Sequence, residues 1–212
     1  MKTLFTTIFF FGGVALSIAA MPVFGQVDGV GISRQPLKDF AAYAKAKNID
    51  WTKPFLVEAE TVLTKNGRFD KEQTKYTETE GDAETIEVVK RAFEAADESG
   101  WLIYLRNQGF EKIKLSARRT AENFSLSLIA EQPTPERANT IASGINGLIY
   151  SVLMLERKNQ TKLGDDEKKV LSGTKVTAQE KTVTINISLA AAAFQEMMRR
   201  RLNEGKEAKT AK

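Results

Sequence analysis

Two glutamates separated by one residue, Glu58 and Glu60, lie in a segment that alternates apolar and polar side chains. On a strand this spacing places both carboxylates on one face, as paired acid–base catalysis requires. Catalysis also needs one of the two carboxylates to be desolvated in a cleft, and a solvated strand face provides none. The pattern therefore favours a structural role. A carboxylate-dependent hydrolase is the enzymatic alternative, with further carboxylates in the run from Asp165 to Glu167.

Four basic residues of one predicted hairpin form a second candidate site: Lys112, Lys114, Arg118 and Arg119. We expect them on the open face of a sheet, beside serine and threonine side chains of neighbouring strands. A basic, hydroxyl-rich face can bind an anionic polymer or lipid headgroup through charge-assisted hydrogen bonds. Half-exposed strands have the same composition without any ligand, and Glu58 and Glu60 can neutralise such a patch. These four residues are the candidate binding residues of the chain.

Two charged runs fall beside predicted helix ends. Asp165 to Glu167 begin a short helix, where carboxylates complement the helix dipole, and Arg199 to Arg201 end one, where cations do. A cation cluster for the acidic run, and an anionic lipid or nucleic acid for the basic run, are the functional alternatives. The dipole accounts for both runs without a ligand, so we expect structural roles.

The chain contains no cysteine and no histidine. This composition excludes disulfides, His- or Cys-based metal sites, and catalytic triads that use either residue. No phosphate-binding loop, dinucleotide fingerprint or nucleophile elbow is present. We therefore expect no cofactor, no metal and no catalytic residue, and a stability that comes from an ordinary hydrophobic core.

The N-terminal residues 1–25 predict a signal peptide. Lys2 precedes an apolar run from Leu4 to Ala20, and Val23 and Gly25 are the small residues of a cleavage site before Gln26. The alternative is an uncleaved anchor, because roughly 20 apolar residues span a bilayer. We expect an exported protein of the bacterial envelope, periplasmic or extracellular. A retained leader would anchor it in the inner membrane, facing the periplasm.

The rest of the chain has room for one core. Its domain organisation is predicted as a linker over 26–54, an α+β domain over 55–202 and a disordered basic tail over 203–212. The 31 Lys and Arg residues and 27 Asp and Glu residues are interspersed and give a net charge of +4. This balance predicts no large one-sided field, and export argues against a nucleic-acid partner.

One pattern recurs three times, beginning near residues 55, 110 and 175: strand, turn, strand, helix. In the first copy Asn66-Gly67 predicts a tight hairpin turn, because both residues tolerate positive φ. A return strand over 74–78 follows, and then a helix that Asp82 caps and Ser99-Gly100 ends. The intervening segment from Trp101 to Leu105 is predicted as an apolar connection.

The second and third copies show the same organisation. Thr134-Pro135 predicts the start of a long helix whose apolar stripe makes it the central packing helix, and Gly144 and Gly147 predict close approach of another backbone. The third copy has strands around 176–178 and 183–189 and a helix over 190–202. Hairpins with one apolar face need a cover, so the predicted fold is an α+β two-layer sandwich. It has an antiparallel sheet of about six strands, with helices on one face.

The first copy resembles the periplasmic C-terminal domain of TonB-type energy transducers. The resemblance covers about residues 55–99 and rests on a strand, the run Thr64 to Asp70 (Thr-Lys-Asn-Gly-Arg-Phe-Asp), a return strand and a helix. Such a family implies an uncleaved N-terminal helix and a small domain that pairs with an extended receptor segment at a sheet edge. No functional residue is carried over from it.

These observations predict a non-enzymatic exported envelope protein. Its role is binding or structural and uses a face or an edge of the sheet. The expected partner is an envelope protein or an anionic envelope polymer. A TonB-like coupling protein, which requires the leader as anchor, and the hydrolase remain alternatives. A ligand carrier is a further alternative, and it predicts an internal cavity lined by Phe124, Leu126, Ile145 and Leu148. The sequence leaves the oligomeric state open.

Overall fold

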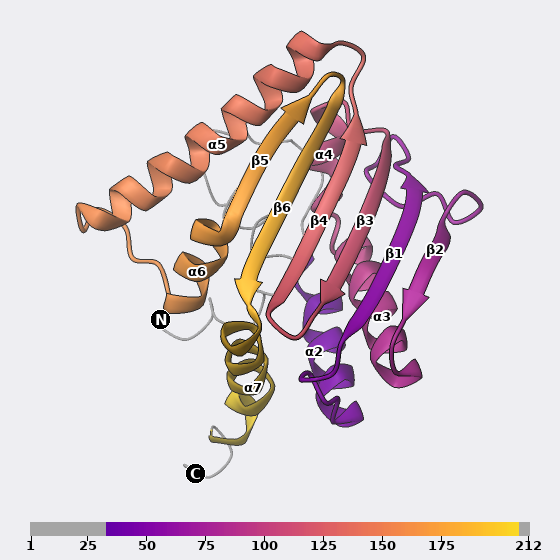
Figure 1. Ribbon diagram of the computed structural model, residues 1–212, viewed down its shortest axis with the longest axis vertical. Helices are drawn as coiled ribbons and strands as arrows, with labels where there is room; N and C mark the ends of the chain where they lie inside the picture. The colour runs from indigo at the N-terminus through magenta and orange to yellow at the C-terminus, as the bar shows by residue number, and fades with distance from the viewer. Residues whose placement is uncertain (1–32, 208–212) are drawn as a thin grey trace.

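The computed structural model describes residues 33–207 of this protein. The predicted leader, its cleavage site, the start of the predicted linker and residues 208–212 lie outside the described residues. Within them, six strands form one antiparallel sheet in the order β2-β1-β3-β4-β6-β5 (Figure 1). The strands are β1 Phe55–Val62, β2 Lys75–Glu80, β3 Lys112–Arg119, β4 Asn123–Glu131, β5 Thr174–Gln179 and β6 Thr182–Ala190.

The helices bury their apolar faces against one side of this sheet, as the α+β two-layer prediction requires. Sequential hairpins β1–β2, β3–β4 and β5–β6 are joined through β1–β3 and β4–β6 pairing, so the three repeated units make a single continuous sheet. The fold class predicted from the alternation of apolar and polar residues is confirmed. The helices are α2 Gln35–Lys47, α3 Ala83–Ser99, α4 Leu102–Asn107, α5 Pro135–Arg157, α6 Asp165–Gly173 and α7 Ala191–Glu207.

An aromatic cluster joins the first, second and last units in the core. Phe124 of β4 stacks on Phe194 of α7, with ring centroids 4.0 Å apart and an interplanar angle of 12°. Trp51 packs edge-on against both Phe55 and Phe194, at 6.3 Å and 6.0 Å. Aromatic pairs at these separations stabilise the fold beyond what the burial of their apolar area contributes. The core therefore depends on residues from both ends of the described chain.

The predicted linker over 26–54 is wrong for the part that is described. Helix α2 buries Leu37, Phe40 and Ala44 in the core and packs against α3 and α7. Its three buried residues recur at helical spacing. The alanine and lysine residues around them make the apolar face of the helix narrow, so the sequence of this segment resembles that of a linker. The folded domain thus includes α2 and Trp51, which precede the predicted boundary.

Two other predicted boundaries move because helices extend further than expected. The apolar connection after Gly100 forms a helix of its own, α4, with Leu102 and Leu105 buried. Helix α7 continues to Glu207, beyond the predicted start of a disordered tail at residue 203, since no proline interrupts it. Its buried residues Phe194, Met197 and Met198 are those that the apolar stripe predicts.

Helix α5 begins as predicted but lies elsewhere in the fold. The Thr134 hydroxyl accepts a hydrogen bond from the Arg137 main-chain N–H, with proline in the first turn. However, α5 runs beside β5 at the border of the sheet rather than over its centre (Figure 1). A Cβ added at Gly144 or Gly147 would meet nothing within 4 Å, so the predicted close backbone approach does not occur within the described chain.

The turn at Asn66-Gly67 is tight but differs from the prediction in its backbone. Only Gly67 has a positive φ, at 67°, and the main-chain N–H of Thr64 donates to the carbonyl of Arg68 across it. The chain then makes a second turn before β2 begins at Lys75. A Cβ on Gly67 would lie 2.3 Å from the main chain of Ile103, so the hairpin is pressed onto the start of α4.

We expect Gly67→Ala to lower the free energy of unfolding by about 2–4 kcal/mol, because the substitution combines a left-handed backbone with a steric overlap. Gly147→Ala is the matched control. It sits in the interior of α5 with open space around it, so it should raise stability by up to about 1 kcal/mol. Urea unfolding of both variants checks this, and equal stability of Gly67→Ala and the wild type would contradict the described packing.

Candidate functional site: the open sheet face and its two edges

Three of the four predicted basic residues share the open face of the sheet. Lys112, Lys114 and Arg118 alternate with the buried residues of β3, as the pattern predicts. Arg119 does not join them. It is 6% exposed on the helix-covered side, where its guanidinium donates to the carbonyl of Thr120. Adjacent residues of a strand point to opposite faces, so Arg118 and Arg119 cannot belong to one patch.

The open face beside β3 has mixed charge. Glu58 of β1 lies 2.6 Å from the Lys114 ammonium, and its side chain is 16% exposed. The hydrogen bond that Lys114 donates to the Glu58 carboxylate raises the pKa of Lys114, and the carboxylates of Glu60 and Glu78 raise it further. Lysine and glutamate thus neutralise each other across neighbouring strands. The arrangement does not favour an anionic polymer as the ligand of this face.

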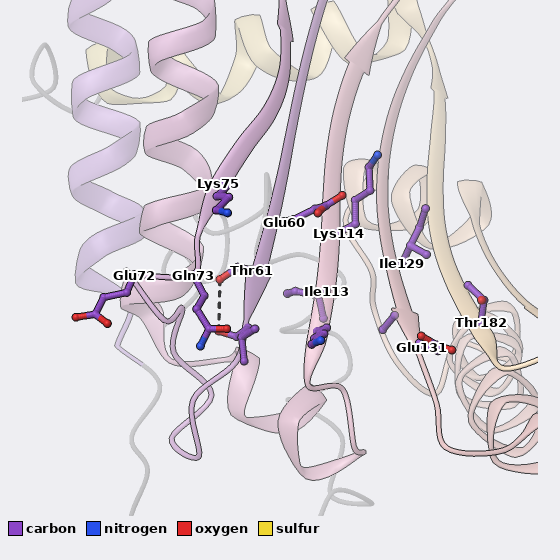
Figure 2. A pocket seen from close by; sticks show the side chains of 13 residues that line it. Glu60, Thr61, Glu72, Gln73, Lys75, Ile113, Lys114, Ile129, Glu131 and Thr182 are labelled. Carbon is purple, nitrogen blue, oxygen red and sulfur yellow. Dashed lines mark hydrogen bonds between the residues drawn. The ribbon is translucent and has the colours of Figure 1, made fainter.

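A cleft of about 620 Å³ lies at one end of the open face, and Figure 2 shows the side chains that line it. Three lysines and three glutamates border it, and its apolar residues include Val62 and Ile129. Of the carboxylates considered for a hydrolase, only Glu60 lines this cleft. The lining residues are Glu60, Thr61, Val62, Glu72, Gln73, Lys75, Lys112, Ile113, Lys114, Ile129, Ala130, Glu131 and Thr182.

The acidic run of α6 and the arginines of α7 are partners of each other. Asp166 is 4% exposed, and its two carboxylate oxygens lie 2.5 Å from Arg200 and 3.0 Å from Arg201. Arg199 pairs instead with Glu196 one turn earlier. Within the described residues, no group of three or more acidic side chains is arranged to hold a metal ion. One residue of the acidic run, Asp166, and two of the arginines, Arg200 and Arg201, therefore dock α7 onto α6.

The interior around Phe124 is packed rather than open. Phe124 is buried against Phe194, whereas Leu126, Ile145 and Leu148 are only partly buried. None of these four residues lines the cleft at the end of the open face. The arrangement gives no support to a ligand carrier that uses them.

The two edges of the sheet differ, and sequence reasoning did not identify the difference. On the β5 edge, the side chain of Asn146 in α5 donates to the carbonyl of Val176 at 2.7 Å and accepts from its N–H at 3.2 Å. One amide group thus replaces a neighbouring strand at the middle of β5. The signal in the sequence is an amide residue, Asn146, between Ile145 and Gly147 in the apolar middle of the helix.

On the opposite edge, β2 pairs only with β1, and no other described strand or helix continues the sheet beyond it (Figure 1). Five of its six residues are exposed. The carbonyl of Val62 accepts from Asp70 on the β2 side, whereas the N–H of Leu63 donates to Glu111 on the β3 side. Because such groups alternate along a strand, Thr79, opposite Val57, directs its N–H and C=O away from β1.

No family model, curated protein or solved structure matches this chain. The resemblance to TonB-type transducers therefore stays a prediction. In the described residues, α5 is the one helix long and apolar enough to cross a membrane, with 33% of its apolar window buried. Core helices of globular domains pass the same test, so this property carries no conclusion about location.

Asp166→Asn is expected to lower the free energy of unfolding by about 2–4 kcal/mol, because it leaves two guanidinium groups facing a neutral side chain in a mostly buried site. Glu196→Gln, which removes an exposed carboxylate that pairs with Arg199, should leave the stability close to that of the wild type, because solvent screens exposed ion pairs. Urea unfolding at pH 7 measures both. Equal effects of the two substitutions would show that Asp166 does not hold α7 in place.

Proposed function

We propose that this protein is an exported envelope protein that recruits a partner protein by adding one of the partner's strands to the edge of β2. The observation that carries the proposal is the contrast between the two borders of the sheet. Asn146 satisfies the main chain at the middle of β5, whereas among the described residues β2 has a neighbouring strand on one side only. Unpaired edge strands are templates for another strand, and strand addition needs no pocket.

The β2 edge carries features that limit uncontrolled pairing. The strand has only six residues, a bulge interrupts its register between Glu58 and Ala59, and charged side chains stand at Lys75, Glu78 and Glu80. Short, charged and irregular edges resist indiscriminate self-association. No described segment covers this edge, although it has these features. It is therefore suited to pairing with one selective partner.

Export supports a partner in the bacterial envelope. The proposal rests on the apolar leader and on the absence of cysteine and histidine from the chain. A TonB-like coupling protein would use a sheet edge in the same way but needs the leader as an anchor. A carboxylate-dependent hydrolase is not proposed, because Glu58 is bonded to Lys114 and Asp166 to two arginines.

The edge is tested with Thr79→Pro. Proline removes the outward N–H of Thr79 and its ring blocks the approach of a strand, while the ladder to β1 is retained. Crosslinking in intact cells that export the full chain should recover its partner about fivefold less, or not at all, since one main-chain hydrogen bond contributes about 1 kcal/mol. The measurement is the yield of each crosslinked protein, identified by mass spectrometry.

Thr79→Ala is the matched control, because it removes the same exposed hydroxyl group and keeps the N–H. It should recover the partner at the wild-type yield. The melting temperatures of both variants are compared with the wild type, so that loss of binding is separated from loss of folding. Unchanged recovery with folded Thr79→Pro would exclude β2 as the docking edge.

The fate of the leader separates the two envelope proposals. We expect the exported chain to begin at Gln26, because Val23 and Gly25 form the cleavage site. The intact mass of the protein recovered from the periplasm or medium measures this. A chain that keeps Met1 and fractionates with the inner membrane would favour the anchored coupling protein instead.

A further inference from the structure

We infer that the strand accepted by β2 is cationic, with lysine or arginine at alternate positions on the side of the open sheet face. The inference rests on the proposed function of the β2 edge and adds the chemistry of the partner. It follows from the charges that surround this edge and from the partners those charges already have.

Negative charge is concentrated at the β2 edge although the chain as a whole is basic. The net charge of the protein is +4, yet the stretch from Asp70 through Glu87, both included, contains seven acidic residues and only two lysines. This stretch includes all of β2 and the first turn of α3. The opposite border strand, β5, contains no acidic residue. The two borders therefore differ in charge as well as in coverage.

On the open face, the outermost carboxylates of β2 lie beyond the Glu58–Lys114 ion pair. Glu78 and Glu80 are exposed, and in the register of the sheet they lie opposite Glu58 and Leu56. Glu58 already pairs with Lys114, and neither outer glutamate forms an ion pair with a described residue. A strand added to β2 would place its side chains directly beside these two carboxylates, where opposite charges stabilise and like charges destabilise pairing.

The helix-covered side of β2 carries charges of both signs. Tyr76 points to α3, and its pKa is raised to about 12 by burial and then by the nearby carboxylates of Glu94 and Glu87. The Lys90 ammonium lies 4.7 Å from the centre of the Tyr76 ring. Arg91 pairs with Glu94, which leaves Glu87 without an ion pair in the described chain. The charge that favours a basic segment is therefore that of Glu78 and Glu80 on the open face.

Three acetylated hexapeptides serve as probes: Lys-Thr-Lys-Val-Lys-Thr, and the same peptide with glutamate or with glutamine in place of lysine. Their affinities for the full exported chain are measured by fluorescence anisotropy at two salt concentrations. The lysine peptide should bind best, and more weakly at high salt. Glu78→Gln combined with Glu80→Gln should weaken its binding roughly 2- to 30-fold, as expected for two cross-strand ion pairs.

Glu131→Gln combined with Glu180→Gln is the matched control. It removes the same two charges from exposed positions outside the acidic stretch and should leave the affinity unchanged. Equal affinity for all three peptides, with loss of binding in Thr79→Pro, would overturn the charge inference and keep the proposed edge. Lysine-peptide binding that survives Thr79→Pro would mean attraction without strand addition, and no binding of any peptide would also overturn the inference.

Discussion

The main-chain groups at the borders of the sheet are the constraint on which the rest of the structure depends. An inner strand satisfies its N–H and C=O groups through two neighbours, whereas a border strand leaves one side to be satisfied by other means. Helix α5 meets this need at β5 with one side chain, Asn146, which bonds both main-chain groups of Val176. The β2 border has no such cover in the described chain. The main chain of β5 is therefore satisfied at its middle, whereas the outer side of β2 is open to another strand.

The position of α5 has a second consequence. Because it lies beside β5, other helices cover the rest of the sheet: α3 packs on β1, and α7 packs on β4 and β6. Helix α2 packs against α3 and α7, and α7 stacks Phe194 on Phe124 beside Trp51. The carboxylate of Asp166 then holds the arginines of α7 against α6. The aromatic cluster and this ion-paired group therefore act on the same helix, one through apolar burial and the other through charge.

Charge is distributed by the sheet in a way that composition hides. Lys114 of β3 pairs with Glu58 of β1, so these two charges balance at the centre of the open face, while the acidic excess collects at the β2 edge. Sequence alternation placed Lys112, Lys114 and Arg118 on one face correctly. The same alternation places Arg119 on the opposite face from Arg118, because consecutive residues of a strand point to opposite faces. Which charges become neighbours across strands is a matter of strand order.

The sequence by itself determined the strands, both ends of α3, the starts of α5, α6 and α7, and the layer arrangement. Period-two alternation, the Thr134-Pro135 start of α5 and the Gly100 end of α3 are local signals that involve only a few successive residues. Tertiary structure alone decided that three hairpins form one sheet, that α2 belongs to the core, and that Asn146 reaches Val176 thirty residues later. The physical reason is that periodicity and capping are short-range properties, whereas the closing of an edge depends on where a distant helix comes to lie.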